Sequence, residues 1–367
     1  AERNDRFFLP IFSPVSGTVT AVEKFMTSSM TQADHLKIQN DHKHTAVRAF
    51  AAFDYEKATW EELLEFVKNA GMLGLGGAGF PTYVKYLKPE NVDLFAVNAV
   101  ECEPYLTADY KNIEENLSLL KTGTLALFKL SKAKKGCIAI KEDKKKQIED
   151  LKKTFEGTPI EIRTVPNIYP MGWERTLVYE LTGKRYNMLP IEAGMILNNA
   201  STAIALGNAI DNGMPITHKY VTVSGDALKD PKNVYVPVGT KAHEIIEAVG
   251  GYKEGVDNVL LIAGGPMMGR TIPNDAFVIA PQNNGLTVLI NKEEDEVACR
   301  CTTTCPSGLQ PVRIAAAGKS KDEATLNKLH VMDCIECGCC SYTCPAKRNM
   351  TQAFKKMKYL VSINKRK

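Results

Sequence analysis

The sequence predicts a multidomain α/β protein that ends in a cysteine-rich domain. Three apolar, strand-like runs alternate with helix-like segments between residues 92 and 165, which is typical of a mostly parallel sheet covered by helices. Between residues 219 and 265 the pattern changes to short strands around one helix. Eight of the ten cysteines then fall between Cys299 and Cys344. Because 367 residues exceed the usual size of a single core, these changes of pattern predict separate domains.

The first part of the chain contains a small β segment and the start of the α/β region. Turn-forming Pro14, Ser16 and Gly17 precede a strand-like run, which predicts a small β-domain. From Thr59 the apolar residues recur at helical spacing, and Thr59 with Glu62 forms a capping-box pattern. The remaining predicted elements are strands over 92–100, 136–141 and 160–165, helices over 113–130, 143–155 and 200–211, strands over 220–225, 233–239 and 258–265 with a helix over 242–249, and helices over 312–317 and 351–361.

Composition and charge exclude several classes of protein. The hydrophobic fraction of 44% and charged fraction of 24% are those of a globular protein. No stretch of about 18 apolar residues is present, and the first residues lack the apolar core of a signal peptide, so a cytoplasmic location is expected. Nucleic acid is not an expected partner, because no binding motif for it accompanies the net charge of +4.

Basic residues concentrate near the end of the sequence. Such a run predicts a solvated helix face or tail, and an acidic protein partner or an anionic membrane surface is the sharper alternative. The residues of this run are Lys355, Lys356, Lys358, Lys365, Arg366 and Lys367.

The strongest motif is C-x2-C-x2-C-x3-C-P, formed by Cys334, Cys337, Cys340 and Cys344. The first three thiolates at this spacing bind one [4Fe–4S] cluster, and the fourth, before proline, ligates the other cluster of a pair. Cys339 falls between ligand positions. Paired C-x2-C motifs also bind zinc, but the run ending in Cys-Pro favours a cluster.

The partner half of this motif is irregular. In the register set by Cys305-Pro306, Asp295 and Ala298 stand where cysteines are expected, and Cys299 is one residue out of step. We therefore expect two clusters, of which the second has an incomplete ligand set that Asp295 or an external ligand would complete. The expected ligands are Cys305, Cys334, Cys337 and Cys340 for the first cluster, and Cys301, Cys344 and Cys299 for the second.

A glycine-rich loop at Gly74, Gly76, Gly77 and Gly79 satisfies the pattern G-x-G-x-x-G. A dinucleotide-binding fingerprint would follow a strand and open a helix, whereas this loop follows a helix. The pattern therefore favours a different phosphate or flavin loop, in which glycines let backbone N–H groups approach a ligand. A tight turn without a ligand stays open, because a lone glycine pattern is weak evidence.

Several segments in order resemble the RnfC family, the peripheral subunits of the Rnf ferredoxin:NAD oxidoreductase, and the NADH- and FMN-binding subunit of respiratory complex I. They are GLGGAGFPTYVK, NAVECEP, YPMGWE and Asn198-Asn199, with SPVSGTVTAVEK, VTVSGDAL, GGPMMG and the cysteine-rich end. The resemblance covers nearly the whole chain. It implies a small barrel-sandwich-like β-domain over 1–50, a Rossmann-like FMN/NADH-binding domain over 51–216, an SLBB β-grasp domain over 217–290 and a ferredoxin-like helical iron–sulfur domain over 291–367.

The resemblance also implies which residues bind FMN and NAD(H). Lys85 would meet a flavin oxygen or phosphate, and Phe80 would stack on the nucleotide. Glu103 and Glu174 would border the nucleotide site. Hydride transfer needs no protein nucleophile, so no catalytic residue is expected and Cys102 is interpreted as a packing residue. The residues that would line or hydrogen-bond the flavin are Gly74, Gly76, Gly77, Gly79, Asn98, Glu101, Asn198 and Asn199.

The implied function is electron transfer between NAD(H), FMN and [4Fe–4S] clusters, with ferredoxin-type partner subunits and peripheral association with a membrane complex. Such a protein is an NADH-dependent oxidoreductase, or a translocase when it belongs to the ion-translocating complex. Trp173, where the family usually has glycine, and the irregular first cysteine motif depart from the pattern. They leave open a soluble RnfC-like reductase that serves a dedicated partner, such as proline reductase or a cobalamin reductase system. A non-catalytic iron–sulfur relay or scaffold is the third alternative.

Overall fold

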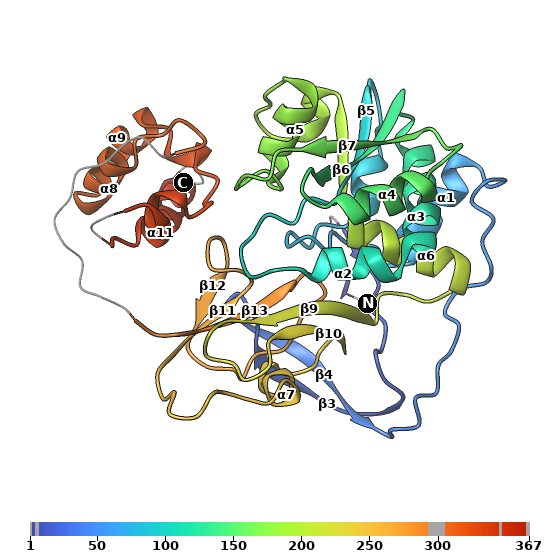
Figure 1. Cartoon of the computed structure of the whole chain (residues 1–367), viewed down its shortest axis with the longest axis horizontal. Helices are drawn as coiled ribbons and strands as arrows, with labels where there is room; N and C mark the ends of the chain where they lie inside the picture. The colour runs from blue at the N-terminus through green and yellow to red at the C-terminus, as the bar shows by residue number, and fades with distance from the viewer. Residues whose placement is uncertain (1, 4–6, 293–304, 345–346, 365–367) are drawn as a thin grey trace. The chain divides into compact units, whose positions relative to one another are not determined.

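The computed structural model describes residues 2–3, 7–292, 305–344 and 347–364 (Figure 1). The chain forms two compact units. Unit 1 comprises Ala1–Gly265 and Arg270–Ile290, and unit 2 comprises Pro266–Gly269 and Asn291–Lys367. No helix among the described residues is long and apolar enough to cross a membrane.

A four-stranded parallel sheet forms the centre of the α/β part of unit 1. Its strands lie in the order β7 (Ile160–Val165), β6 (Lys135–Lys141), β5 (Leu94–Asn98) and β8 (Met195–Asn199). The strands are apolar along their length because helices cover both faces of the sheet, as parallel sheets require. The predicted mostly parallel sheet is therefore confirmed.

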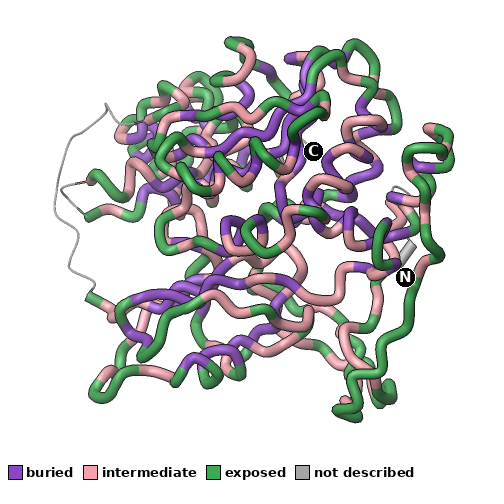
Figure 2. Tube along the Cα trace, turned by 45° about the vertical axis from the view of Figure 1, so that its right-hand side comes forward, coloured by how far each residue is buried: buried purple, intermediate pink, exposed green. Residues whose placement is uncertain are grey.

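Alternate residues of β5 enter two different cores. Phe95 and Val97 pack in a core with helices on one face of the sheet, whereas Leu94 and Ala96 pack on the other face with α5. Figure 2 shows buried residues following the strands and the inward sides of the helices. The helices of this region are α1 (Trp60–Asn69), α2 (Ala108–Glu115), α3 (Leu117–Ser131), α4 (Lys145–Thr154), α5 (Glu174–Thr182) and α6 (Ala200–Asn212), with short 3-10 helices η1 (Thr82–Tyr86) and η2 (Pro190–Ala193).

Two predictions about helix ends have different outcomes. The capping box is present at the start of α1, where the Glu62 N–H donates to Thr59 Oγ1 and the Thr59 N–H donates to Glu62 Oε2. The single helix predicted over 113–130 is wrong, because the chain breaks between α2 and α3 at Asn116. Asn116 Nδ2 donates to the Asn112 carbonyl at 3.1 Å, and such local side-chain bonds compete with helical backbone bonds.

Residues 218–290 form a five-stranded sheet in the order β10 (Lys232–Pro237), β9 (His218–Ser224), β13 (Gly285–Ile290), β11 (Val259–Ala263) and β12 (Arg270–Ile272). Helix α7 (Ala242–Ala248) shares a core with these strands. Strands β13 and β9 pair in parallel, and the other pairs are antiparallel. This mixed sheet has the short strands and single helix that the sequence predicts.

The N-terminal segment contributes a long hairpin, β3 (Gly17–Met26) and β4 (Gln32–Asn40), after the short pair β1 (Glu2–Arg3) and β2 (Phe8–Leu9). Hydrogen bonds join the turn of the hairpin to the five-stranded part of unit 1. Asn283 Nδ2 donates to Ser28 Oγ at 2.9 Å, and an Arg270 guanidinium N–H donates to the Ser29 carbonyl at 2.7 Å.

Unit 2 is helical within its described residues. Helices α8 (Pro311–Lys319), α9 (Glu323–Lys328), α10 (Cys339–Tyr342) and α11 (Met350–Asn364), with the 3-10 helix η3 (Val331–Asp333), surround a small core. Ile314, Leu326, Phe354 and Val361 are almost fully buried in it. Two predicted helices, over 312–317 and 351–361, are confirmed as α8 and α11.

Candidate functional site

The parallel sheet has a topological switch between β5 and β8. After β5 the chain adds β6 and β7 on one side, and β8 then returns to the other side of β5. Ligands of such sheets bind in the crevice outside the carboxyl ends of the strands at the switch. Asn98 and Asn199 end these two strands and are direct partners in the register. The predicted asparagines therefore lie at the place where the topology predicts a ligand.

The glycine loop lies against the start of α6, which directly follows β8. The Leu75 N–H donates to Thr202 Oγ1 at 2.9 Å. A Cβ atom added to Gly76 would lie 3.1 Å from the side chain of Asn199. A larger residue at position 76 would therefore press on the switch-point asparagine.

Hydrogen bonds within the loop hold its shape. The Gly74 N–H donates to the Phe80 carbonyl at 2.8 Å, and the Gly79 N–H donates to the Gly74 carbonyl at 3.0 Å. Gly77 has a φ of +115°, which side chains rarely adopt, and a Cβ there would meet no atom within 4 Å. One side of the loop is therefore open at Gly77.

Lys85, on η1, reaches the same edge of the sheet. Its Nζ donates to the carbonyl of Leu197 in β8 at 2.6 Å. Burial lowers the pKa of Lys85, and the nearby Glu174 carboxylate partly opposes this. Glu174 itself accepts a hydrogen bond from the Tyr186 hydroxyl at 2.9 Å. Lys85 thus places an amine with further donor capacity beside the end of β8.

Asn98 joins two loops at the end of β5. Its Nδ2 donates to the Gly172 carbonyl at 2.9 Å, and its Oδ1 accepts from the Val100 N–H at 2.9 Å. A Cβ on Gly172 would lie 2.0 Å from the Val100 carbonyl oxygen, so this close approach requires glycine. The next residue, Trp173, has a buried indole Nε1 without a hydrogen-bond partner among the described residues.

Asn198 and Asn199 are held by buried polar partners. Asn199 Oδ1 caps α6 by accepting from the Ser201 N–H, and its Nδ2 donates to Asp109 at 2.7 Å. Ser201 Oγ donates to the other oxygen of Asp109 at 2.6 Å. Asn198 Nδ2 donates to the Tyr86 hydroxyl. The structure therefore brings the two asparagines to the site in fixed orientations.

The predicted acidic residues lie around the same loops. Glu101 accepts from the backbone N–H groups of Asp109 and Tyr110. Burial raises the pKa of Glu101, and the Asp109 charge raises it further. Glu103 packs against the turn after β11, since a Cβ on Gly265 would lie 1.9 Å from Glu103 Cγ.

Phe80 is the exposed aromatic residue of the glycine loop. Its side chain remains 37% exposed. The ring of Phe7 contacts it edge to face, with ring centroids 5.7 Å apart. Phe80 thus presents an accessible ring face or edge next to the loop.

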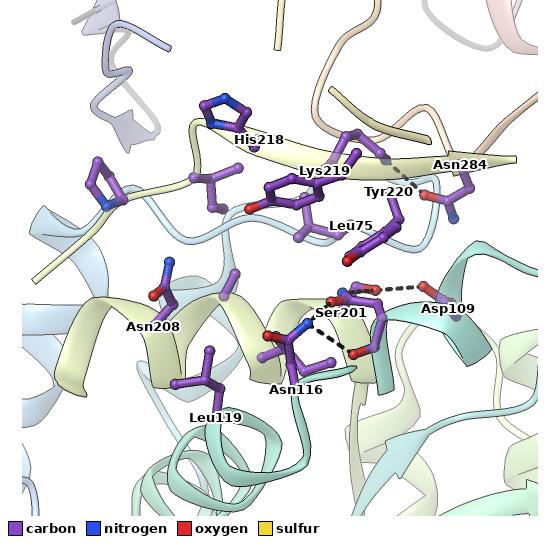
Figure 3. Close-up of a pocket in the computed structure, with 16 residues that line it drawn as sticks. Leu75, Asp109, Asn116, Leu119, Ser201, Asn208, His218, Lys219, Tyr220 and Asn284 are labelled. Atoms are coloured by element: carbon purple, nitrogen blue, oxygen red, sulfur yellow. Dashed lines mark hydrogen bonds between the residues drawn. The ribbon is translucent and has the colours of Figure 1, made fainter. Parts of the chain in front are cut away.

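A polar cavity of about 220 Å³ adjoins this site between α2, α6 and β9 (Figure 3). Leu75, Asp109 and Ser201 line the cavity and also contact residues of the switch-point site or the glycine loop. Lys219 Nζ donates to the Pro281 carbonyl at 2.6 Å and to Asn284 Oδ1 at 2.9 Å. Burial lowers the pKa of Lys219 to about 7.

Sequence reasoning missed Asp109, Thr202 and Lys219. Asp109 and Thr202 act by holding Asn199 and the glycine loop, and neither belongs to a recognised motif. The one available signal was the short polar sequence after Asn199, which is typical of a helix start. Lys219 offered no signal, because a lysine in a strand is usually exposed.

Four predicted cluster ligands lie together in unit 2. Cys305, Cys334, Cys337 and Cys340 line one small cavity of about 20 Å³. Burial and the neighbouring thiols raise the pKa of Cys340 to about 11. Among the residues the structure describes, no three metal-ligand side chains are placed to hold a single metal ion.

The remaining cysteines are placed differently. Cys344 follows α10, where its N–H donates to the Ser341 carbonyl, and it is not among the residues lining the cavity. Cys339 lies close to Cys337, Cys340 and Cys305, and burial followed by these thiols raises its pKa to about 12. The predicted ligands Cys299 and Cys301 lie outside the described residues.

Two parts of the chain match known domain families. Residues 67–208 match the Nuo51 FMN-binding domain, and residues 220–271 match the SLBB domain. The first range contains the parallel sheet and the glycine loop, and the second contains strands β9 to β11. The predicted fold class, an FMN-binding α/β domain followed by an SLBB domain, is therefore confirmed.

Solved structures share the same architecture. The NAD⁺-reducing [NiFe]-hydrogenase in its air-oxidised state has a TM-score of 0.55 and 20% identity, covering 83% of this chain and 54% of that chain. In its H₂-reduced state the values are 0.58 and 18%, covering 84% and 62%. At these identities the likeness shows the fold alone.

Closer relatives are similar along most of this chain. The RnfC-type component of the proton-translocating ferredoxin:NAD⁺ oxidoreductase complex of Clostridium ljungdahlii is 34% identical over 97% of this chain and 79% of the relative. Its counterpart in the Na⁺-translocating complex of Acetobacterium woodii is 31% identical over 100% and 85%. The counterpart in the ion-translocating oxidoreductase complex of Vibrio cholerae is 31% identical over 89% of this chain but only 44% of the relative. The chain therefore belongs to the RnfC family of ferredoxin:NAD⁺ oxidoreductase complexes.

Proposed function

We propose that this chain passes electrons between NAD(H) and iron–sulfur clusters by way of FMN, as an oxidoreductase subunit of a ferredoxin:NAD⁺ complex. One observation carries the proposal. The glycine loop, Lys85 and the paired residues Asn98 and Asn199 converge at the switch between β5 and β8. This is the place where an open parallel sheet binds a ligand.

The residues at the switch fit FMN. The open side of the loop at Gly77 lets the backbone approach a phosphate or a ring closely. Lys85 offers a donor with positive charge, and Trp173 offers a buried indole N–H for which a bound group would supply the acceptor. When bound, FMN accepts a hydride as an electron pair and releases single electrons.

The protein groups at this site bind and orient rather than react. Asn98 and Asn199 fix the loops that carry Gly172 and Asp109, so the walls of the crevice are set before a ligand enters. The exposed ring of Phe80 would stack on the nucleotide, with Glu103 and Glu174 at the border of the nucleotide site. No nucleophile is required of the chain.

The cysteines of unit 2 would hold the clusters. Cys305, Cys334, Cys337 and Cys340, which line one cavity, would ligate a first [4Fe–4S] cluster. Thiolates are the ligands such clusters require, and these four side chains already face one space. Cys301, Cys344 and Cys299 would ligate a second cluster, with Asp295 or an external ligand completing it.

The relatives named above are subunits of ion-translocating complexes, and we propose the same setting for this chain. It would associate peripherally with the cytoplasmic side of a membrane complex and exchange electrons with iron–sulfur partner subunits. Trp173 and the irregular first cysteine motif favour a second candidate, an NADH-dependent reductase that serves a dedicated soluble partner. Copurification of membrane subunits with the tagged chain from its native cells would support the first candidate over the second.

Anaerobic purification followed by iron, sulfide and flavin analysis tests the proposal. We expect one FMN and about eight irons per chain, or about four when only the first cluster is present. Stopped-flow mixing with NADH is expected to bleach the flavin absorbance and then produce cluster signals in electron paramagnetic resonance. Zinc in place of iron, or a protein that binds no FMN, would contradict the proposal.

A further inference from the structure

The cysteine-rich end of the chain carries an excess of positive charge that the electron-transfer site does not explain. From Cys337 to Lys367 the sequence contains eight lysines and arginines and no aspartate or glutamate. Because the whole chain has a net charge of +4, residues 1–336 carry −4, the difference between +4 and +8. The positive charge is therefore a local property of the end that contains the cluster cysteines.

Helix α11 links this charge to the cysteine cavity. Thr351 and Phe354 on its inward side line the cavity together with the four cysteines. Lys358 Nζ donates to the Cys334 carbonyl at 2.8 Å and to Glu336 Oε1 at 2.8 Å. One side of α11 therefore forms a wall of the cavity and is tied to the loop that carries its ligands.

The opposite side of α11 is exposed and mixes charge with aromatic surface. Positions 355, 356, 359 and 360 share one face of a helix, because residues three and four apart are neighbours. Tyr359 is 66% exposed and Leu360 is 46% exposed, and Lys356 is also exposed while Lys355 is half-buried. We call these four residues the α11 face.

The composition of the α11 face indicates a protein partner rather than a membrane. A helix that lies in a membrane interface needs a free apolar side. The apolar side of α11, formed by Phe354, Met357 and Val361, is already buried in the core of unit 2. Tyrosine beside basic residues is instead typical of the anchors of protein interfaces.

We propose that the α11 face is the docking surface for an acidic electron-carrier protein. The proposal rests on the proposed function, since the carrier would give one electron to, or take one from, the cluster held by the cysteines behind α11. No bond or proton needs to move in this step. Positive charge at the docking surface speeds the encounter with an acidic partner, and added salt weakens that effect.

Reversal of charge on this face tests the proposal. The double variant Lys355→Glu and Lys356→Glu is compared with Lys152→Glu and Lys153→Glu, an adjacent exposed pair on α4 that changes the net charge equally. The probe is a dithionite-reduced, acidic bacterial ferredoxin, mixed with the oxidised protein in a stopped-flow instrument. At low ionic strength we expect the second-order rate constant to fall roughly tenfold or more in the α11 variant and less than about twofold in the α4 variant.

Salt dependence and affinity give independent readouts. The rate constant of the unaltered protein should fall as salt is raised, and the α11 variant should lose most of this dependence. Calorimetric titration with oxidised ferredoxin should give weaker binding for the α11 variant, and this measurement decides docking even in a protein that holds no cluster. Iron content and dithionite reduction, measured on the same samples, test the cluster proposal separately.

Three results would overturn the proposal. Equal losses in the α11 and α4 variants would assign the effect to net charge rather than to this face. An unchanged rate constant and affinity in the α11 variant, with its iron content intact, would exclude the face as the docking surface. Sedimentation with phosphatidylglycerol vesicles that depends on Lys355 and Lys356, without any effect on ferredoxin, would assign the face to a membrane surface instead.

Discussion

Asn98 and Asn199 are direct partners across the parallel strands β5 and β8, and each is the last residue of its strand. Their side chains extend in different directions from this shared edge. The Asn98 amide holds the loop of Gly172, and the Asn199 amide holds Asp109 at the start of α2. Two paired residues therefore connect separate loops to the crevice where the sheet changes direction, and variants near the crevice should affect ligand binding more than folding.

Replacement of Lys85 separates binding from stability. Lys85→Met removes the charged donor at the end of β8 but keeps the length of the side chain. We expect FMN affinity to fall by roughly tenfold or more, the usual cost of losing a hydrogen bond from a charged group. Because burial disfavours the charge of Lys85, the flavin-free variant should melt no lower than the unaltered protein.

Flavin fluorescence during titration of the flavin-free protein measures the affinity, and differential scanning fluorimetry measures the melting temperature. Lys88→Met, an exposed position just beyond η1, is the matched control and should change neither value. Unchanged FMN affinity in Lys85→Met would remove Lys85 from the flavin site.

A second prediction concerns the packing of α3 on α6. A Cβ on Gly123 would lie 1.8 Å from the Ala203 carbonyl oxygen, so alanine cannot fit without moving the helices apart. We expect Gly123→Ala to lower the free energy of unfolding by more than about 3 kcal/mol, in the range of severe overpacking and lost contacts. Ser118→Ala, at an exposed position of the same helix, should be neutral or slightly stabilising.

Urea denaturation followed by circular dichroism at 222 nm (a standard helix signal) compares the two variants. A Gly123→Ala protein as stable as Ser118→Ala would mean that α3 and α6 are not in direct backbone contact. Such a result would also question the position of α6, whose first residues hold the glycine loop.

The sequence predicted the central sheet well because each strand is a short apolar run between helices. The break at Asn116 was not predictable from periodicity, since apolar spacing continues through it and only the local hydrogen bond of Asn116 ends the helix. The site was predicted in its motif residues but not in their supports. Asp109 lies 90 positions before Asn199 in the sequence, so only the fold reveals that the two side chains meet.

The cysteine cluster offers a matched pair of adjacent residues. Cys340 lines the cavity with the other three expected ligands, whereas Cys339 falls between ligand positions of the motif. Cys340→Ser should remove one [4Fe–4S] cluster, a loss of about four irons per chain. Cys339→Ser should keep the iron content of the unaltered protein. Iron and sulfide analysis of anaerobically purified protein measures both, and equal iron loss in the two variants would contradict the ligand assignment.

The last prediction concerns the pH dependence of stability at Lys219. Burial lowers the pKa of Lys219 to about 7, from an ordinary value near 10.5. Between these two values the unfolded chain binds a proton that the folded protein does not. The contribution of Lys219 to the free energy of unfolding therefore rises as the pH is raised from about 7 to about 10, by at most about 1.4 kcal/mol per pH unit.

Lys219→Met lacks the titrating group, so the melting temperature of the unaltered protein should gain on that of the variant across this pH range. The comparison uses the difference between the two proteins, because other groups titrate equally in both. The exposed Lys145→Met on α4 serves as the control and should show a pH-independent difference. The Lys219 variant also leaves the Pro281 carbonyl and Asn284 without their donor, which shifts its stability at every pH but not the slope. A Lys219→Met difference that stays constant with pH would mean that the buried amine is charged in the folded protein throughout, with the polar groups of the cavity compensating its burial.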